Sequence, residues 1–167
     1  NEVKELLFLK TSQSSEDPSV EVIELSQADS QLFKGKKSIE LSIICDFGPV
    51  TNYLYEPHAG VLKAGFFKMV GKGLQKIAPN THLYTSEDLD TNFAGRTFEV
   101  LAEGPLEKKW IQTVLPAGKA NISTRNFPIK ADEIRKKFQL KDGGEFTLFA
   151  FRDQANKNKV VLAKKIS

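Results

Sequence analysis

The sequence predicts an α+β protein, with a small antiparallel sheet followed by a mixed α/β part that contains two main helices. Short apolar runs that alternate with polar residues, a pattern typical of strands, occur in both halves of the chain. Residues 61–74 and 131–140 instead show the spacing of amphipathic helices. We expect residues 1–50 to form a strand-rich segment and residues 51–167 to form a second domain.

The first segment contains three candidate strands. Residues 3–10, 20–25 and 39–47 are apolar runs, and the last is rich in β-branched residues and ends before Gly48-Pro49. Because no helical pattern separates them, an antiparallel sheet is the simplest arrangement. The single cysteine, Cys45, lies in the third run, and we interpret it as a buried strand residue and not as a nucleophile.

A corner where a strand meets a helix is expected next. Tyr53 and Tyr55 alternate with Leu54, which indicates the end of a strand. Pro57 fits the first position of a helix because it has no N–H group to leave unpaired. The apolar spacing of residues 61–74 then predicts the helix itself. The residues expected to organise this corner are Tyr53, Tyr55, Glu56, Pro57 and His82.

The remaining chain is predicted to contain short strands and one further helix. The expected strands cover residues 82–85, 96–102, 110–115, 120–127, 145–152 and 159–166. The helix covers residues 131–140, with acidic residues near its start and basic residues near its end, as the helix dipole favours. We expect the strands on either side of Gly104-Pro105 to pair antiparallel and the last two strands to form a hairpin.

Several functional classes are disfavoured by what the sequence lacks. No apolar run is long enough to span a membrane, and neither glycine-rich nucleotide-binding motif occurs. No signal peptide is recognisable at the start, and we expect a cytoplasmic protein because a single cysteine, which allows no disulfide framework within the chain, is consistent with that location. The weakest of our hypotheses is a residual acid–base or metal site at Glu56, His58 and His82, because two histidines without a compact motif are usually surface or hydrogen-bonding residues.

Charge is unevenly distributed along the chain. Residues 1–118 contain 12 basic and 16 acidic residues, a net charge of −4, whereas residues 119–167 contain 12 basic and 5 acidic residues, a net charge of +7. This asymmetry indicates an acidic partner, of which nucleic acid is the commonest. The candidate phosphate contacts are Lys119, Arg125, Asn126, Lys130, Arg135 and Lys136, with a second patch at Lys63, Lys68 and Lys72. Phe127 could stack on a base. In the alternative interpretation, Phe127 belongs to the core and the basic residues only form a solvated surface.

Several motifs occur in an order that resembles a known family. They are Tyr53-Leu54-Tyr55-Glu56-Pro57, Lys63-Ala64-Gly65, PNTHLYTS at residues 79–86, Gly95-Arg96 and KANISTRNFP at residues 119–128. Together they are similar to the C-terminal part of bacterial class I S-adenosylmethionine-dependent methyltransferases, chiefly from Bacteroidetes. The resemblance implies a ferredoxin-like segment at residues 1–50, a THUMP-like domain at residues 51–167, and a catalytic domain N-terminal to Asn1.

The resemblance also implies a function. S-adenosylmethionine would bind to the catalytic domain, and no cofactor is expected within these residues. Because THUMP domains bind structured RNA, our first hypothesis is an accessory domain that binds transfer or ribosomal RNA for the methyltransferase. The alternative is a protein-interaction or dimerisation module that packs on the methyltransferase domain, and the sequence indicates no oligomeric state.

Overall fold

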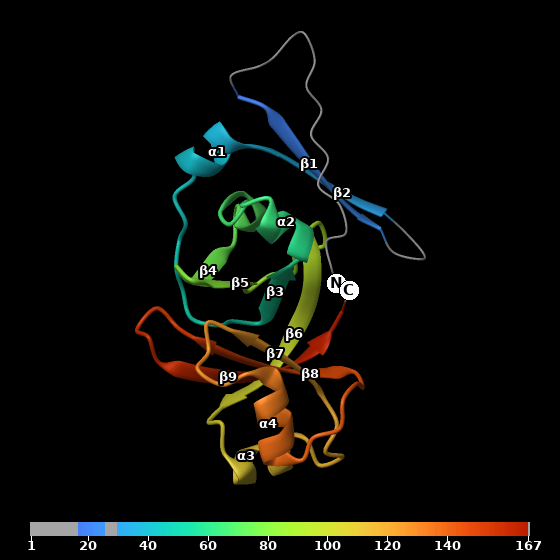
Figure 1. Ribbon diagram of the computed structural model, residues 1–167. Helices are drawn as coiled ribbons and strands as arrows, with labels where there is room; N and C mark the ends of the chain where they lie inside the picture. Colours follow the sequence, from blue (N-terminus) through green and yellow to red (C-terminus); the bar gives the residue numbers. More distant parts are fainter. Residues whose placement is uncertain (1–16, 26–29, 167) are drawn as a thin grey trace.

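The structure is a computed structural model that describes residues 17–25 and 30–166 (Figure 1). Within these residues, β1 (Ser19–Leu25) and β2 (Ser30–Lys36) form a two-stranded antiparallel ribbon. A second sheet has seven strands in the order β4-β5-β3-β6-β9-β8-β7. The strand predicted at residues 3–10 lies outside the described residues.

The seven-stranded sheet is mixed. Its strands are β3 (Tyr53–Pro57), β4 (Gln75–Ala78), β5 (Thr81–Ser86), β6 (Gly95–Gly104), β7 (Asn121–Arg125), β8 (Phe146–Arg152) and β9 (Asn158–Lys165). Only β7 and β8 pair parallel among these strands, and the helix between them provides the crossover that a parallel pair requires. The predicted α+β class is confirmed.

The helices of the described residues are short. They are α1 (Lys37–Ser42), α2 (Ala59–Lys63), the 3₁₀ turn η1 (Met69–Gly71), α3 (Lys108–Val114) and α4 (Ala131–Phe138). In Figure 1, α1, α2 and the β1–β2 ribbon lie at one end of the molecule, and α3 and α4 lie at the opposite end. None of these helices is long and apolar enough to cross a membrane.

The large sheet curls so that strands far apart in its order face one another. The Ser123 hydroxyl of β7 donates a hydrogen bond to the Glu56 carboxylate of β3, at 2.7 Å. The Thr81 hydroxyl at the start of β5 likewise donates to the backbone carbonyl of Arg152 at the end of β8, at 2.6 Å. Between the facing strands lies an apolar cluster formed by Leu54, Ile77, Leu83, Phe98, Phe149, Phe151, Val161 and Ala163.

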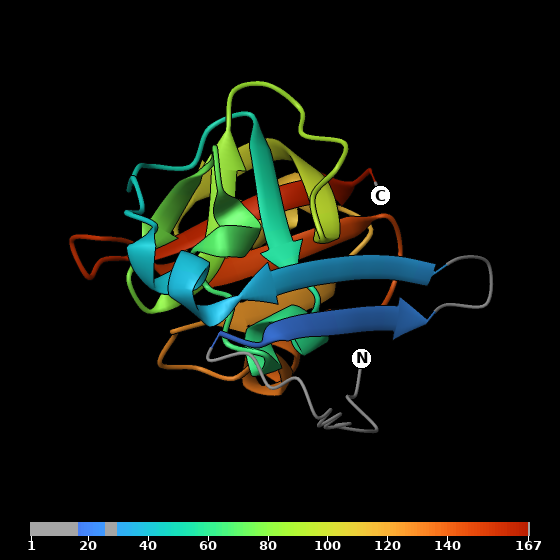
Figure 2. The same cartoon turned by 90° about the horizontal axis from the view of Figure 1, so that it is seen from above.

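Each outer face of the curled sheet has its own apolar cluster. Under α3 and α4, Ile111 and Ile134 pack on residues of β8 and β9 such as Leu148. On the other side, Tyr55 and Phe66 belong to a cluster that α2 contributes to and the β1–β2 ribbon covers (Figure 2). Alternate residues of β3 therefore serve different clusters, as the period of two in a strand requires.

A buried carboxylate anchors α1 to the rest of the fold. Glu40 is 6% exposed and accepts hydrogen bonds from three consecutive backbone N–H groups, those of Phe67, Lys68 and Met69, at 2.9, 2.8 and 2.8 Å. These groups precede and begin η1, so they have no partner within the turn itself. Glu40 thus provides the negative charge and the acceptors that this segment lacks.

The prediction of a helix over residues 61–74 is wrong. Helix α2 begins at Ala59 and ends at Lys63, and Gly65 and Gly73 have φ values of +75° and +87°, which a right-handed helix cannot contain. The apolar spacing instead comes from a loop and a 3₁₀ turn that bury Phe66 and Val70. Pro57 is the last residue of β3 and not the first of a helix.

Two predicted strands are also wrong. Residues 110–115 lie mostly in helix α3, where Ile111 and Leu115, four positions apart, are both buried. The expected antiparallel pair around Gly104-Pro105 therefore does not form. Residues 39–47 begin in α1 and continue as irregular chain, so Cys45 is half-buried and outside any strand. The strands expected at 20–25, 82–85, 96–102 and 120–127, helix α4 and the final hairpin are confirmed.

Candidate functional site

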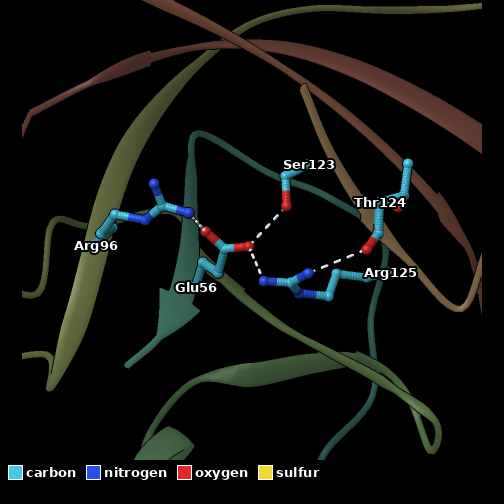
Figure 3. Close-up of polar contacts among 5 residues, drawn as sticks. All are labelled: Glu56, Arg96, Ser123, Thr124 and Arg125. Atoms are coloured by element: carbon cyan, nitrogen blue, oxygen red, sulfur yellow. Dashed lines mark hydrogen bonds and ion pairs between the residues drawn. The ribbon is translucent and has the colours of Figure 1, made fainter. Parts of the chain in front are cut away.

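Three strands of the curled sheet converge on the carboxylate of Glu56. Glu56 lies on the same face of β3 as Leu54, so its side chain points between the facing strands, and it is 1% exposed. Arg96 is the residue directly opposite Glu56 on β6, and Ser123 and Arg125 come from β7 (Figure 3). Residues 40 to 69 positions apart in the sequence thus meet at one buried charge.

Both carboxylate oxygens of Glu56 are paired. Oε2 accepts a hydrogen bond from Nη2 of Arg96, and Oε1 accepts from Nη2 of Arg125 and from the Ser123 hydroxyl (Figure 3). The two guanidinium groups are partly open to solvent, with side chains that are 45% and 36% exposed. A buried carboxylate needs such partners, because an unpaired charge at this depth would be strongly destabilising. We call these four residues the Glu56 cluster.

Two corner residues predicted from the sequence, Tyr53 and Tyr55, lie on the face of β3 opposite Glu56 and have structural contacts. The Tyr55 hydroxyl accepts a hydrogen bond from the Asp90 N–H at 2.8 Å and donates one to the Asp88 carbonyl at 3.2 Å. Tyr53 packs on the apolar cluster that includes Tyr55. These contacts hold the 86–94 loop against β3.

His82 stacks on Phe67, with ring centroids 4.5 Å apart. Burial lowers the pKa of His82, and the positive charges of Lys76 and Arg125 lower it further. Its Nδ1 atom is buried without a hydrogen-bond partner, as is Nε of Arg125. The imidazole is therefore neutral over more of the acidic range than an exposed histidine.

The structure provides no support for a catalytic or metal site at Glu56, His58 and His82. Glu56 is bound by two arginines and a serine. Among the residues that the structure describes, no group of three or more His, Cys, Asp or Glu side chains could hold a metal ion. A surface pocket of about 370 Å³ beside Lys72 and Glu87, and another of about 420 Å³ beside Phe47 and Asp153, lack a glycine-rich turn between a strand and a helix of the kind that cradles a nucleotide.

A group of exposed lysines surrounds α4, and we call it the α4 basic surface. It comprises Lys119, Lys130, Lys136, Lys137 and Lys141. Lys119 and Lys141 are brought together by a backbone bridge between the segment before β7 and the segment after α4. Within the described residues, none of the five has an ion-pair partner, so their charges face solvent.

The two arginines predicted as phosphate contacts are already paired. Arg125 belongs to the Glu56 cluster, and Arg135 donates to the carboxylates of Asp132 and Asp142 at 2.5 and 2.6 Å. Asn126 has a φ of +49°, a left-handed conformation in the turn that follows β7. Phe127 packs, half-buried, on the apolar cluster under α4, which limits its availability for stacking on a base.

The second predicted patch does not form a continuous stripe, because the helix expected to carry it ends early. Lys63 is exposed at the end of α2, and Lys68 is half-buried where η1 begins. Lys72 is exposed beside a pocket that is also lined by Glu87, Asp88 and Asp90. Acidic neighbours therefore offset part of its charge.

Sequence reasoning did not identify Arg96 and Ser123 as partners of Glu56. The alternation of inward and outward residues along β3 and β6 could have indicated that Glu56 and Arg96 pair. Glu56 shares its strand face with Leu54, and Arg96 shares its face with Phe98, so opposite charges occupy core-facing positions of two strands. Charged residues at such positions are rarely buried unless they are paired. This pattern indicates a buried ion pair but does not identify the third strand.

Two regions of the chain match known protein families, and one solved structure is similar to most of the chain. Residues 95–165 match the family described as THUMP domain-like, and residues 53–93 match a family described as a ferredoxin-like domain. A crystal structure of a protein described as a putative methyltransferase, from Porphyromonas gingivalis W83, is 35% identical over 89% of this chain, with a TM-score of 0.81. This chain covers 38% of that protein. No curated protein matches.

The chain therefore contains a ferredoxin-like region followed by a THUMP-like region. The resemblance to the corresponding part of a Bacteroidetes methyltransferase, drawn from the motifs, is confirmed by these family matches and by the P. gingivalis structure. The two regions meet at residue 94, whereas we expected the ferredoxin-like part at residues 1–50. They share one sheet, because β3 of the first region pairs with β6 of the second.

Proposed function

We propose that these residues bind structured RNA, transfer or ribosomal, as an accessory region for a methyltransferase domain elsewhere in a longer protein. The THUMP-like match and the methyltransferase description of the P. gingivalis relative support this role. That relative is also much longer than this chain, which covers 38% of it. S-adenosylmethionine would then bind to the methyltransferase domain, and the protein would act in the cytoplasm, where its RNA substrates reside.

The observation that carries the proposal is the α4 basic surface. Its five lysines are exposed, and no carboxylate among the described residues pairs with any of them. Exposed lysines with this arrangement can neutralise phosphates and release bound counterions, which supplies affinity without base readout. Shape and backbone contacts are the usual means of recognising double-stranded RNA.

The surface is long enough to follow an RNA backbone. Six positions separate Lys119, which lies just before β7, from Arg125 at its end, a distance of about 20 Å at roughly 3.3 Å per residue of extended chain. Helix α4 runs back beside β7 from Lys130, so lysines occur near both ends of this strand. Several phosphates along one strand could therefore be contacted at once.

A pair of matched variants tests the proposal. Lys119→Gln with Lys136→Gln removes two charges from the α4 basic surface, and Lys63→Gln with Lys72→Gln removes two from the second patch. Binding to transfer RNA and to a ribosomal RNA helix is measured by fluorescence anisotropy at 50 mM salt. We expect the first variant to bind about tenfold more weakly, as the loss of two phosphate contacts implies, and the second to bind nearly as the wild type does. Equal affinity for all three proteins would contradict the proposal.

A protein-contact role is the second candidate, and a different surface favours it. Ile23 and Leu32 lie opposite each other on the outer face of the β1–β2 ribbon and are 60% and 63% exposed. Leu41 and Ile44, in and after α1, are 78% and 90% exposed. Exposed apolar side chains concentrated on neighbouring elements are typical of a contact surface for another domain or a second copy.

Sedimentation velocity over a range of protein concentrations tests the second candidate as a dimerisation role. Leu41→Lys with Ile44→Lys places charges on exposed positions that the fold does not bury. If the surface forms a dimer, the wild type will sediment faster as concentration increases and the variant will remain monomeric. If the wild type stays monomeric at every concentration, dimerisation is refuted, and contact with another domain is the remaining protein-contact role.

A further inference from the structure

The Glu56 cluster contains more positive than negative charge. One carboxylate, 1% exposed, is shared by the guanidinium groups of Arg96 and Arg125. Ser123 adds a neutral donor at 2.7 Å. The cluster therefore has a net charge of +1, and the excess lies on the two partly exposed side chains. A cluster that served only to neutralise a buried carboxylate would need one arginine.

The guanidinium groups also have more donors than partners. Each carries five N–H donors in a planar fork. Arg96 uses Nη2 for Glu56, while Arg125 uses Nη2 for Glu56 and Nη1 for the Thr124 carbonyl at 3.0 Å. Nε of Arg125 is buried and has no partner in the structure, but the same is true of Nε of Arg135, so this atom does not distinguish the cluster. The donors that remain on the exposed parts of these two guanidinium groups are of the kind that phosphate oxygens accept.

Both arginines are held in place before any ligand arrives. The Arg96 guanidinium lies 5.7 Å from the ring centroid of Phe98, a residue with no exposed surface. Arg125 is fixed from two sides, by Glu56 and by Thr124. Because these side chains have already lost rotamer freedom on folding, a ligand that binds them loses less free energy to ordering.

Strand β7 connects the cluster to the α4 basic surface, with Ser123 and Arg125 on the face of β7 opposite the one that α4 covers. Arg125 is the last residue of β7, and Lys130 immediately precedes α4, five positions later in the chain. Lys119 lies before the opposite end of β7. An RNA strand that follows β7 and α4 from Lys119 would reach the arginine pair at the far end of the strand.

We propose that Arg96 and Arg125 form a binding site for a phosphate group, with Glu56 as the residue that positions both guanidinium groups. The phosphate is supplied by the RNA backbone if the proposed function holds, and this identification of the source rests on that function. Free inorganic phosphate presents the same oxygens, so it is the second source to be tested. The site adds an arginine-based anchor to a surface otherwise formed by lysines.

The first experiment uses Arg96→Gln, which leaves Glu56 paired with Arg125 and Ser123 and so preserves the fold. Arg135→Gln is the matched control, since Arg135 is also ion-paired but with two carboxylates, an arrangement that has no excess positive charge. RNA affinity is measured across a salt series, and urea unfolding confirms that both variants are folded. We expect Arg96→Gln to weaken binding about threefold to tenfold and to reduce the salt slope by about one, while Arg135→Gln does neither.

The second experiment distinguishes the phosphate sources. Arginine Nε–Hε resonances are followed by NMR during titration with inorganic phosphate, with sodium chloride at equal ionic strength as the reference. We expect phosphate to shift the Arg96 and Arg125 signals and not those of Arg135. Arg96→Lys retains the charge but not the fork, and we expect it to recover only part of the RNA affinity.

The outcomes separate this inference from the proposed function. If RNA binds but Arg96→Gln matches the wild type, and phosphate shifts neither resonance, the phosphate site is refuted while the RNA-binding function stands. If no RNA binds, the proposed function fails, and a phosphate shift confined to Arg96 and Arg125 would still support the site for free phosphate. No RNA binding and no phosphate shift would overturn both.

Discussion

At the scale of single residues, the closure of the curled sheet depends on the buried carboxylate of Glu56. Glu56 lies at the end of a strand whose other inward residue, Leu54, is fully buried in an apolar cluster. Its charge is acceptable there only because Arg96, Arg125 and Ser123 satisfy both oxygens. The contacts join β7 to β3 across the interior, so the cluster holds the curled sheet closed.

A double-mutant cycle on the two arginines tests this role. Arg96→Met and Arg125→Met each leave Glu56 with one arginine and Ser123, and we expect each to lower the free energy of unfolding by about 1–2 kcal/mol. The double variant leaves a buried carboxylate with only Ser123, and we expect a loss of about 3–5 kcal/mol, at or above the sum of the single losses. Urea unfolding measures all four proteins. A double variant less destabilised than either single variant would contradict the pairing.

His82 makes the free energy of unfolding depend on pH, and its contribution decreases stability as the pH falls. Burial and the positive charges of Lys76 and Arg125 lower the pKa of this histidine in the folded state. Below about pH 6.5, where an unfolded histidine gains a proton, the unfolded state therefore binds more protons and stability falls until the folded pKa is reached. Comparing urea unfolding at pH 8 and pH 5.5, we expect His82→Gln to lose less stability on acidification than the wild type. Identical losses would show that His82 is not responsible.

At the scale of elements, residues 61–74 show why periodicity was misleading. Apolar residues recur every four positions, yet glycines with positive φ at Gly65 and Gly73 interrupt any helix. Gly71 is buried in η1 because Tyr84 packs against it. The same apolar residues are used, but they reach the core from a loop and one 3₁₀ turn.

Gly71→Ala separates the two interpretations of this segment. In a continuous helix this change would stabilise by up to about 1 kcal/mol. In the structure, the added Cβ would lie 2.2 Å from Cδ1 of Tyr84, and we expect a loss of about 1–3 kcal/mol from overpacking. Lys72→Ala, at an exposed neighbouring position, is the control and should change stability by less than about 0.5 kcal/mol. If Gly71→Ala instead raises the melting temperature, the result would support a continuous helix over residues 61–74.

Local patterns predicted those elements in which the spacing of apolar residues in the sequence equals the spacing of the buried positions. Strand β6 and helix α4 were predicted because each alternates or repeats against an apolar layer, and the β8–β9 hairpin was predicted from two apolar runs that are buried on both faces. Helix α3 was mistaken for a strand because its seven residues are too few to establish a period. The candidate site was only partly predictable, since the meeting of Glu56 with Arg125 depends on the curl of the whole sheet and not on any local pattern.

At the scale of the whole molecule, one curled sheet joins the ferredoxin-like and THUMP-like regions. Its interior is apolar, one end is closed by the Glu56 cluster, and its outer faces are covered by α3 and α4 on one side and by α2 and the β1–β2 ribbon on the other (Figures 1 and 2). The unpaired lysines lie beside α4, and the exposed apolar side chains lie on the ribbon and near α1. This separation would allow RNA and a second protein surface to be contacted at once.

The most direct test of the central claim is the salt dependence of RNA binding by these 167 residues. Affinity for transfer RNA and for a ribosomal RNA helix is measured between 50 and 300 mM salt. The proposed function predicts that the logarithm of the affinity falls linearly with the logarithm of the salt concentration, with a slope that decreases in magnitude when Lys119 and Lys136 are replaced. No binding at 50 mM salt, or an affinity that does not change with salt, would contradict it.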